Sequence, residues 1–81
     1  MHLEIITPDK KVFEGEVEAA TFPGTDGSFQ VLKDHAPLIS SLSKGDLVYK
    51  DNEGTHSIVV DGGVVEVLNN RVIVLAEAVL S

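Results

Sequence analysis

Three glutamates at alternate positions are the first group of side chains that could do chemistry. Glu14, Glu16 and Glu18 fall on one face of an extended segment, because side chains alternate along a strand. Paired carboxylates can act as general acid and base. That role needs an apolar pocket to separate their pKa values, and the sequence supplies none here. The spacing therefore favours a solvated strand face whose charges protect a sheet edge.

Histidines, serines and glycines provide no further catalytic or ligand-binding pattern. His2, His35 and His56 lie in three separate segments, without the close spacing of converging metal ligands. Ser40, Ser41 and Ser43 lack a nucleophile-elbow context, and neither glycine-rich phosphate-binding motif occurs. We therefore expect no catalytic residue, no cofactor site and no metal site, and hence a protein that is not an enzyme.

Lys33 offers an alternative class of function. Swinging-arm carrier domains are small, acidic and all-β, with a modified lysine at a hairpin tip. Lys33 precedes Asp34 in a predicted loop, but His35-Ala36-Pro37 follows in place of the flanking residues of such a motif. A covalent lysine adduct in the intact mass would identify a carrier.

Size and charge limit the partners. The chain has 81 residues, which predicts one domain over residues 1–81. Its net charge of -7 disfavours nucleic acid and direct binding to anionic lipid. There are no cysteines, so disulfides and thiolate metal sites are excluded. No stretch approaches the roughly 20 apolar residues that span a bilayer, and the first residues lack the pattern of a signal peptide.

The elements that position these side chains are predicted to be strands. Valine and isoleucine outnumber leucine and alanine, 17 to 13, which suits a pleated surface. Turn signals recur every several residues, and Asn69-Asn70 predicts a tight hairpin. The pattern predicts an all-β antiparallel sandwich of about ten short strands. The segments that we expect to form strands are 3–7, 12–13, 16–22, 28–32, 38–42, 46–50, 55–60, 64–68 and 71–76.

A longer pattern covers nearly the whole chain. Its first part is Phe13-x-Gly15-x-Val17-Glu18, Pro23-Gly24-x-x-Gly27, Val31-Leu32, His35-Ala36-Pro37-Leu38 and Gly45. Its second part is Gly62-Gly63, Glu66-Val67, Asn70 and Val72-x-Val74-Leu75-Ala76. In order and spacing these motifs resemble the N-terminal β-sandwich domain of the F-type ATP synthase epsilon subunit. The resemblance implies the same sandwich fold.

The resemblance also implies a function and partners. It implies a central-stalk rotor subunit of a bacterial enzyme, at the cytoplasmic face of the inner membrane. The chain would be a monomer within a hetero-oligomeric complex. One side would bind the gamma subunit, and loops at one end would rest on the membrane rotor ring of c subunits. This coupling would transmit ion-driven rotation to ATP synthesis. The implied ring contacts are Asp26, Ser28, Asp34 and His35, held by the loop residues Pro23, Gly24, Gly27, Ala36 and Pro37.

Two departures from the family pattern change these expectations. The family often has an acidic ring contact where this chain has Ser28, so Asp26 or Asp34 would supply the charge. Longer members continue into a C-terminal helical hairpin that inhibits hydrolysis. The chain stops at Ser81, so we expect neither that inhibition nor ATP binding. We also expect an apolar patch for gamma on a sheet face, away from the 23–38 loops.

Overall fold

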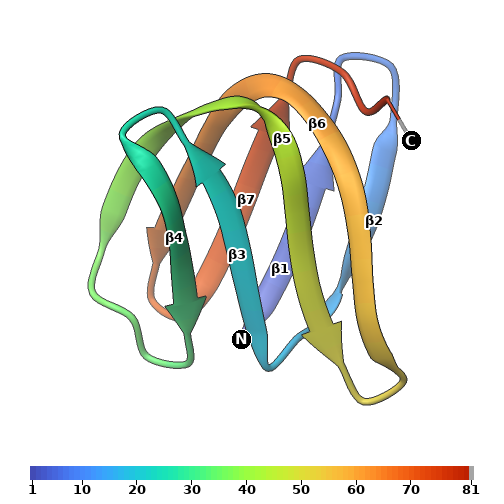
Figure 1. The fold of residues 1–81 in the computed structure, drawn as a ribbon. Helices are drawn as coiled ribbons and strands as arrows, with labels where there is room; N and C mark the ends of the chain where they lie inside the picture. Colours follow the sequence, from blue (N-terminus) through green and yellow to red (C-terminus); the bar gives the residue numbers. More distant parts are fainter. Residues whose placement is uncertain (81) are drawn as a thin grey trace.

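The computed structural model describes residues 1–80, which form a two-layered β-sandwich (Figure 1). The described residues contain no helix, and therefore none that could cross a bilayer. The all-β prediction is confirmed. The strands are β1 (His2–Ile6), β2 (Lys11–Glu16), β3 (Ala19–Gly24), β4 (Gly27–Leu32), β5 (Leu38–Asp51), β6 (Gly54–Leu68) and β7 (Arg71–Ala76).

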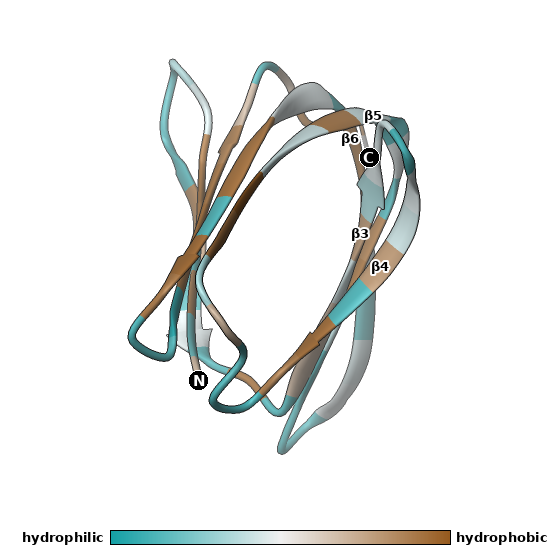
Figure 2. Ribbon diagram, turned by 90° about the vertical axis from the view of Figure 1, so that its left-hand side faces the viewer, coloured by the Kyte–Doolittle hydropathy of each residue, from teal (hydrophilic) through white to brown (hydrophobic). Residues whose placement is uncertain are grey.

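All seven strands belong to one sheet, in the order β2-β1-β7-β6-β5-β3-β4. The sheet becomes a sandwich because β5 and β6 are 14 and 15 residues long and bend over from one layer into the other. One layer contains β2, β1, β7 and the second half of β6 with the first half of β5. The other contains the remaining halves with β3 and β4. Figure 2 shows the two layers from the side, joined by these long strands.

The strand count differs from the sequence prediction for a physical reason. The segments 38–42 and 46–50 are halves of β5, and 55–60 and 64–68 are halves of β6. Gly45, Gly62 and Gly63 lie at the bends, where they let the backbone turn without breaking the ladder. The structure therefore has seven strands, not ten. The β1–β7 pair is parallel, whereas every other pairing between the described strands is antiparallel.

The prediction of one strand over residues 16–22 is wrong. β2 ends at Glu16 and β3 begins at Ala19. Between them the Val17 N–H donates to the carbonyl of Met1, and the Glu18 N–H donates to the carbonyl of Lys50. Val17 and Glu18 thus bond to different layers, and the link between β2 and β3 carries the chain from one layer to the other.

The core fills the space between the layers with aliphatic and aromatic side chains. Phe22, Leu3, Ile5 and Leu47 are fully buried, and no charged or polar side chain among residues 1–80 is buried with them. Phe22 also contacts the ring of Phe29, with centroids 5.6 Å apart. Strand alternation places every second side chain in this core, so the intervening side chains form the two outer faces.

Candidate functional site

One outer face of the sandwich carries both apolar and charged side chains. It is formed by β1, β2, β7, the second half of β6 and the first half of β5, and we call it the outer face. Directly opposed residues in a ladder share a side of the sheet, so the register gives its rows. These rows are Ser41, Val64, Leu75, Ile6 and Lys11; Ile39, Glu66, Ile73, Glu4 and Glu14; and Leu68, Arg71, His2 and Glu16.

The part of this face over β5, β6 and β7 is mainly apolar, although it also carries the charged residues Glu66 and Arg71; we call it the apolar part. Ile39 is 72% exposed, and Leu75 is 54% exposed opposite Val64. Of the six exposed large hydrophobic residues in the described chain, four lie here: Ile39, Val64, Leu68 and Leu75. These exposed apolar residues lie on a sheet face, as expected, but a depression beside Ile39 is also lined by Pro37, so the apolar part is not separate from the 23–38 loops. Such a cluster normally marks a surface that another molecule covers.

Two shallow depressions border the apolar part. One of about 390 Å³ is lined by Ile6, Pro8 and Leu75 with their neighbours. The other, of about 400 Å³, is lined by residues 37–39 and 66–68. Both have mainly aliphatic walls, so each could receive a side chain from a partner.

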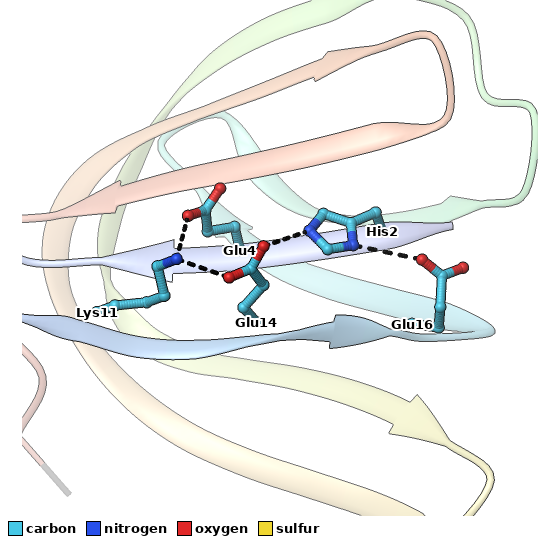
Figure 3. A network of polar contacts seen from close by, with 5 residues as sticks. All are labelled: His2, Glu4, Lys11, Glu14 and Glu16. Carbon is cyan, nitrogen blue, oxygen red and sulfur yellow. Dashed lines mark hydrogen bonds and ion pairs between the residues drawn. The ribbon is translucent and has the colours of Figure 1, made fainter.

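The part of the face over β1 and β2 is a polar network (Figure 3). Lys11 Nζ lies 2.6 Å from Glu14 Oε1 and 3.2 Å from Glu4 Oε2. His2 lies between Glu14 and Glu16, with Nε2 3.0 Å from the second oxygen of Glu14, Oε2, and Nδ1 3.3 Å from Glu16 Oε2. Sequence spacing could not reveal this cluster, because it depends on the pairing of β1 with β2.

These contacts change two ionisation equilibria in opposite directions. The hydrogen bond from Lys11, followed by the one from His2, lowers the pKa of Glu14. The hydrogen bonds to Glu14 and then to Glu4 raise the pKa of Lys11. The ligand atoms of His2, Glu4 and Glu14 lie within 4.8 Å of one another, as cation ligands would. The Lys11 ammonium already bonds both carboxylates, however, so a metal ion would have to displace it.

The β3–β4 turn presents two of the predicted contact residues. Thr25 and Asp26 form its tip, and Asp26 and Ser28 are exposed. The Thr25 N–H donates to the carbonyl of Ser41 at 3.1 Å, which fixes the tip against β5. A Cβ on Gly24 would lie 2.7 Å from the Gly27 carbonyl oxygen and 2.9 Å from the Phe29 ring. Because a side chain would not fit in this space, position 24 requires glycine, and the close packing makes the turn stiff.

The loop at residues 33–37 contains the other two predicted contact residues, Asp34 and His35. Asp34 has a φ of 63°, and its N–H donates to Asn70 Oδ1 at 3.0 Å. The His35 N–H donates to the carbonyl of Leu32 at 3.2 Å, closing a turn. Ala36 and Pro37 are exposed and lead into β5. This loop therefore lies beside the β6–β7 turn.

The expectation that these two loops share one end of the sandwich is wrong. β4 runs from Gly27 to Leu32, with one loop before it and the other after it. Six extended residues span about 20 Å, so the loops lie at opposite ends, as Figure 1 shows at the top and bottom of β4. Asp26 and Ser28 therefore form one group, and Asp34 and His35 form another.

The remaining sequence candidates are dispersed. Glu18 lies beyond the end of β2, apart from Glu14 and Glu16. His56 Nε2 lies 3.1 Å from Asp51 Oδ1 near the β5–β6 turn. Ser43 Oγ donates to the carbonyls of Pro23 and Gly24. Lys33 is exposed in its loop, as the carrier hypothesis requires.

Sequence reasoning did not name the apolar residues of the outer face, although a signal for them exists. Residues 72–76 are apolar at every position, so both faces of β7 are apolar. Val72 and Val74 enter the core, whereas Ile73 and Leu75 point to the outer face. A strand that is apolar on both faces needs a cover on each, and residues 1–80 supply a cover for one face only.

Comparison with known proteins identifies relatives of the whole sequence. Residues 1–81 match the family described as ATP synthase, delta/epsilon chain, β-sandwich domain. The chain is 49% identical over 78 residues to the ATP synthase epsilon chain of Nitratidesulfovibrio vulgaris, covering 96% of this chain and 58% of that one. It is 47% identical over 76 residues to that of Pelotomaculum thermopropionicum, covering 94% and 57%. The chain thus spans a little over half the length of these relatives.

Solved structures share the fold. A chain of the Euglena gracilis mitochondrial ATP synthase, from a structure of its OSCP, F1 and c-ring, superposes with a TM-score of 0.89 at 23% identity, over 96% of this chain and 51% of that one. A chain of the Tetrahymena thermophila central stalk and c-ring gives 0.84 at 17% identity, over 99% and 65%. With a family match over its full length, the chain belongs to the β-sandwich domain family of ATP synthase delta and epsilon chains.

Proposed function

We propose that this chain works as an epsilon-type rotor subunit, joining the gamma subunit to the membrane ring of a bacterial F-type ATP synthase. It would transmit rotation without catalysing a reaction, at the cytoplasmic face of the membrane, as a monomer within the complex. Family membership supports this role. The observation that carries it is the apolar part of the outer face, where Ile39 and Leu75 are 72% and 54% exposed.

Gamma would cover this apolar part. Burying apolar surface stabilises a complex by about 25 cal/mol per Å², and the flanking depressions would admit its side chains. The charged half of the face then forms a polar rim around the contact. The opposite outer face carries polar residues such as Thr21, Thr55 and Ser57, and gives a partner less apolar area to bury.

The ring would contact the β3–β4 turn. Ring loops in this family carry basic and amide side chains, to which an acidic surface is complementary. Asp26 is the only charged residue between Pro23 and Ser28. In the 33–37 loop the positive charge of Lys33 offsets the negative charge of Asp34. Pro37 of the same loop lines the depression beside Ile39, which a gamma side chain would fill. We therefore assign the ring contact to Asp26 and Ser28, and place Asp34 and His35 beside gamma.

Leu75→Asp tests the gamma surface. It adds a charge that gamma would have to desolvate, so we expect the affinity for purified gamma to fall at least about tenfold. Ser57→Asp on the opposite outer face is the matched control and should bind normally. Both residues are exposed, and the circular dichroism spectra should remain those of a folded β-protein. Equal affinity of the two variants for gamma would contradict the proposal.

Asp26→Lys tests the ring surface. The reversal replaces attraction by repulsion, and an exposed ion pair is worth only about 0.2–1 kcal/mol, so we expect a partial effect. We expect normal gamma binding with weaker attachment of the catalytic head to membranes and slower ATP synthesis in reconstituted vesicles. Asp34→Lys is the control. A larger loss of ATP synthesis with Asp34→Lys would move the ring contact to the other end of the sandwich.

A further inference from the structure

The two edge strands of the sheet differ in how they are protected. β2 carries the charges of Lys11, Glu14 and Glu16, and its pairing with β1 contains a bulge. Such features hinder the addition of another strand. β4 reads Gly-Ser-Phe-Gln-Val-Leu, without charge or proline, and pairs with β3 over six residues without a shift. No strand among the described residues lies on its other side. β4 is therefore a regular, unprotected edge.

The register shows which main-chain groups of β4 are free. Pro23 opposes Ser28, and because proline has no N–H this pair cannot be a hydrogen-bonded pair of the ladder. Antiparallel pairs alternate, so Ser28, Gln30 and Leu32 direct their main-chain groups outward. The Leu32 carbonyl accepts the His35 N–H. The outward groups of Ser28 and Gln30 make no other main-chain bond within residues 1–80.

We propose that β4 is a strand-addition site, and that an extended segment of gamma pairs with the main-chain groups of Ser28 and Gln30 and with the Leu32 N–H, while the Ser28 side chain stays free for the ring. This inference rests on the proposed function. Alternate side chains of the added strand would lie beside Gln30 and the 52% exposed Leu32. A second copy of the chain could pair in the same way. At a net charge of -7 each, however, two copies repel, which favours a neutral or basic segment from another protein.

Hydrogen exchange with purified gamma tests this directly. When gamma binds, the amides of Ser28 and Gln30 should exchange at least about tenfold more slowly, because they enter a ladder. Gln30→Pro removes the outward N–H but no bond to β3, and edge strands tolerate proline. It should weaken gamma binding about tenfold by leaving a carbonyl unpaired. Gln30→Thr removes the same side chain but keeps the N–H, and should bind normally.

The outcomes separate the two proposals. Normal gamma binding with unprotected Ser28 and Gln30 amides would overturn strand addition and leave the stalk function standing. Absence of gamma binding by the unaltered chain would overturn both. Self-association that Gln30→Pro abolishes would identify a second copy as the occupant, against our assignment. Equal weakening by Gln30→Pro and Gln30→Thr would point to a side-chain contact and also overturn the proposal.

Discussion

Glu14 lies between Lys11 and His2 on the outer face. One of its oxygens lies 2.6 Å from Lys11 and the other 3.0 Å from His2. Both contacts favour the ionised carboxylate, so its pKa in the folded protein lies below the ordinary 4.5. Its contribution to folding stability is therefore present above about pH 4.5 and is lost as the pH falls through the lowered folded pKa.

Glu14→Gln should consequently change the acid dependence of stability. The variant should be less stable than the unaltered chain at neutral pH, and the difference should shrink as the pH falls through the lowered folded pKa of Glu14, because the carboxylate then becomes protonated. Urea unfolding midpoints across this range measure the effect. Glu66→Gln is the control, since Glu66 lies on the same face but makes no ion pair with the described residues. A pH-independent difference for Glu14→Gln would exclude this linkage.

The β6–β7 turn shows how one short element has two roles. Asn69 and Asn70 have φ angles of 51° and 62°, as a tight hairpin requires. This hairpin was predictable from the two asparagines alone. Asn70 additionally accepts the Asp34 N–H through Oδ1 and the His2 N–H through its carbonyl. The turn therefore ties the 33–37 loop and β1 to the same end of the sandwich.

Asn70→Gly separates these roles. Glycine adopts the positive φ, but the hydrogen bond to Asp34 is lost, which should lower stability by about 0.5–1.5 kcal/mol. We expect faster amide exchange at Asp34 while the β6–β7 ladder stays protected. In Asn69→Gly the bond remains, so Asp34 should exchange at its original rate. If both variants increased the amide exchange rate of Asp34 equally, the hydrogen bond from the Asp34 N–H to Asn70 Oδ1 would not be what orders the loop.

At the scale of the whole molecule, two bent strands hold the layers together. β5 and β6 pair with each other on both sides of their bends, so neither layer is a separate folding unit. Gly62 and Gly63 permit the bend in β6 with φ angles of 81° and 130°. A Cβ on Gly63 would collide with the Leu75 carbonyl and approach Ala76 Cα to 2.8 Å.

Gly63→Ala should therefore cost more stability than a matched glycine replacement. Gly54 has nearly the same φ, 129°, but open space where a Cβ would lie. Gly54→Ala should cost backbone strain alone, about 1–3 kcal/mol. Gly63→Ala adds steric overlap of about 1–3 kcal/mol. Denaturant unfolding measures both, and equal losses would show that the clash relaxes without cost.

The class of fold and the local turns could be predicted from sequence patterns alone. Alternating β-branched residues require strands, and Asn69-Asn70 requires a tight turn, because both effects act between neighbours along the chain. The order of motifs also indicated the family. These features depend on backbone preferences and spacing, which a sequence displays directly.

Contacts between residues that are distant in the sequence could not be predicted, because they depend on how the strands pair. The parallel pairing of β1 with β7 and the antiparallel pairing of β1 with β2 place His2 between Arg71 and Glu16. The bends keep β5 and β6 continuous where separate strands were expected, and β4 separates the loops of Asp26 and Asp34. Strand register is set by long-range burial of one face against another. No local pattern reports it, so the outer face and the free edge of β4 became visible only in the folded sheet.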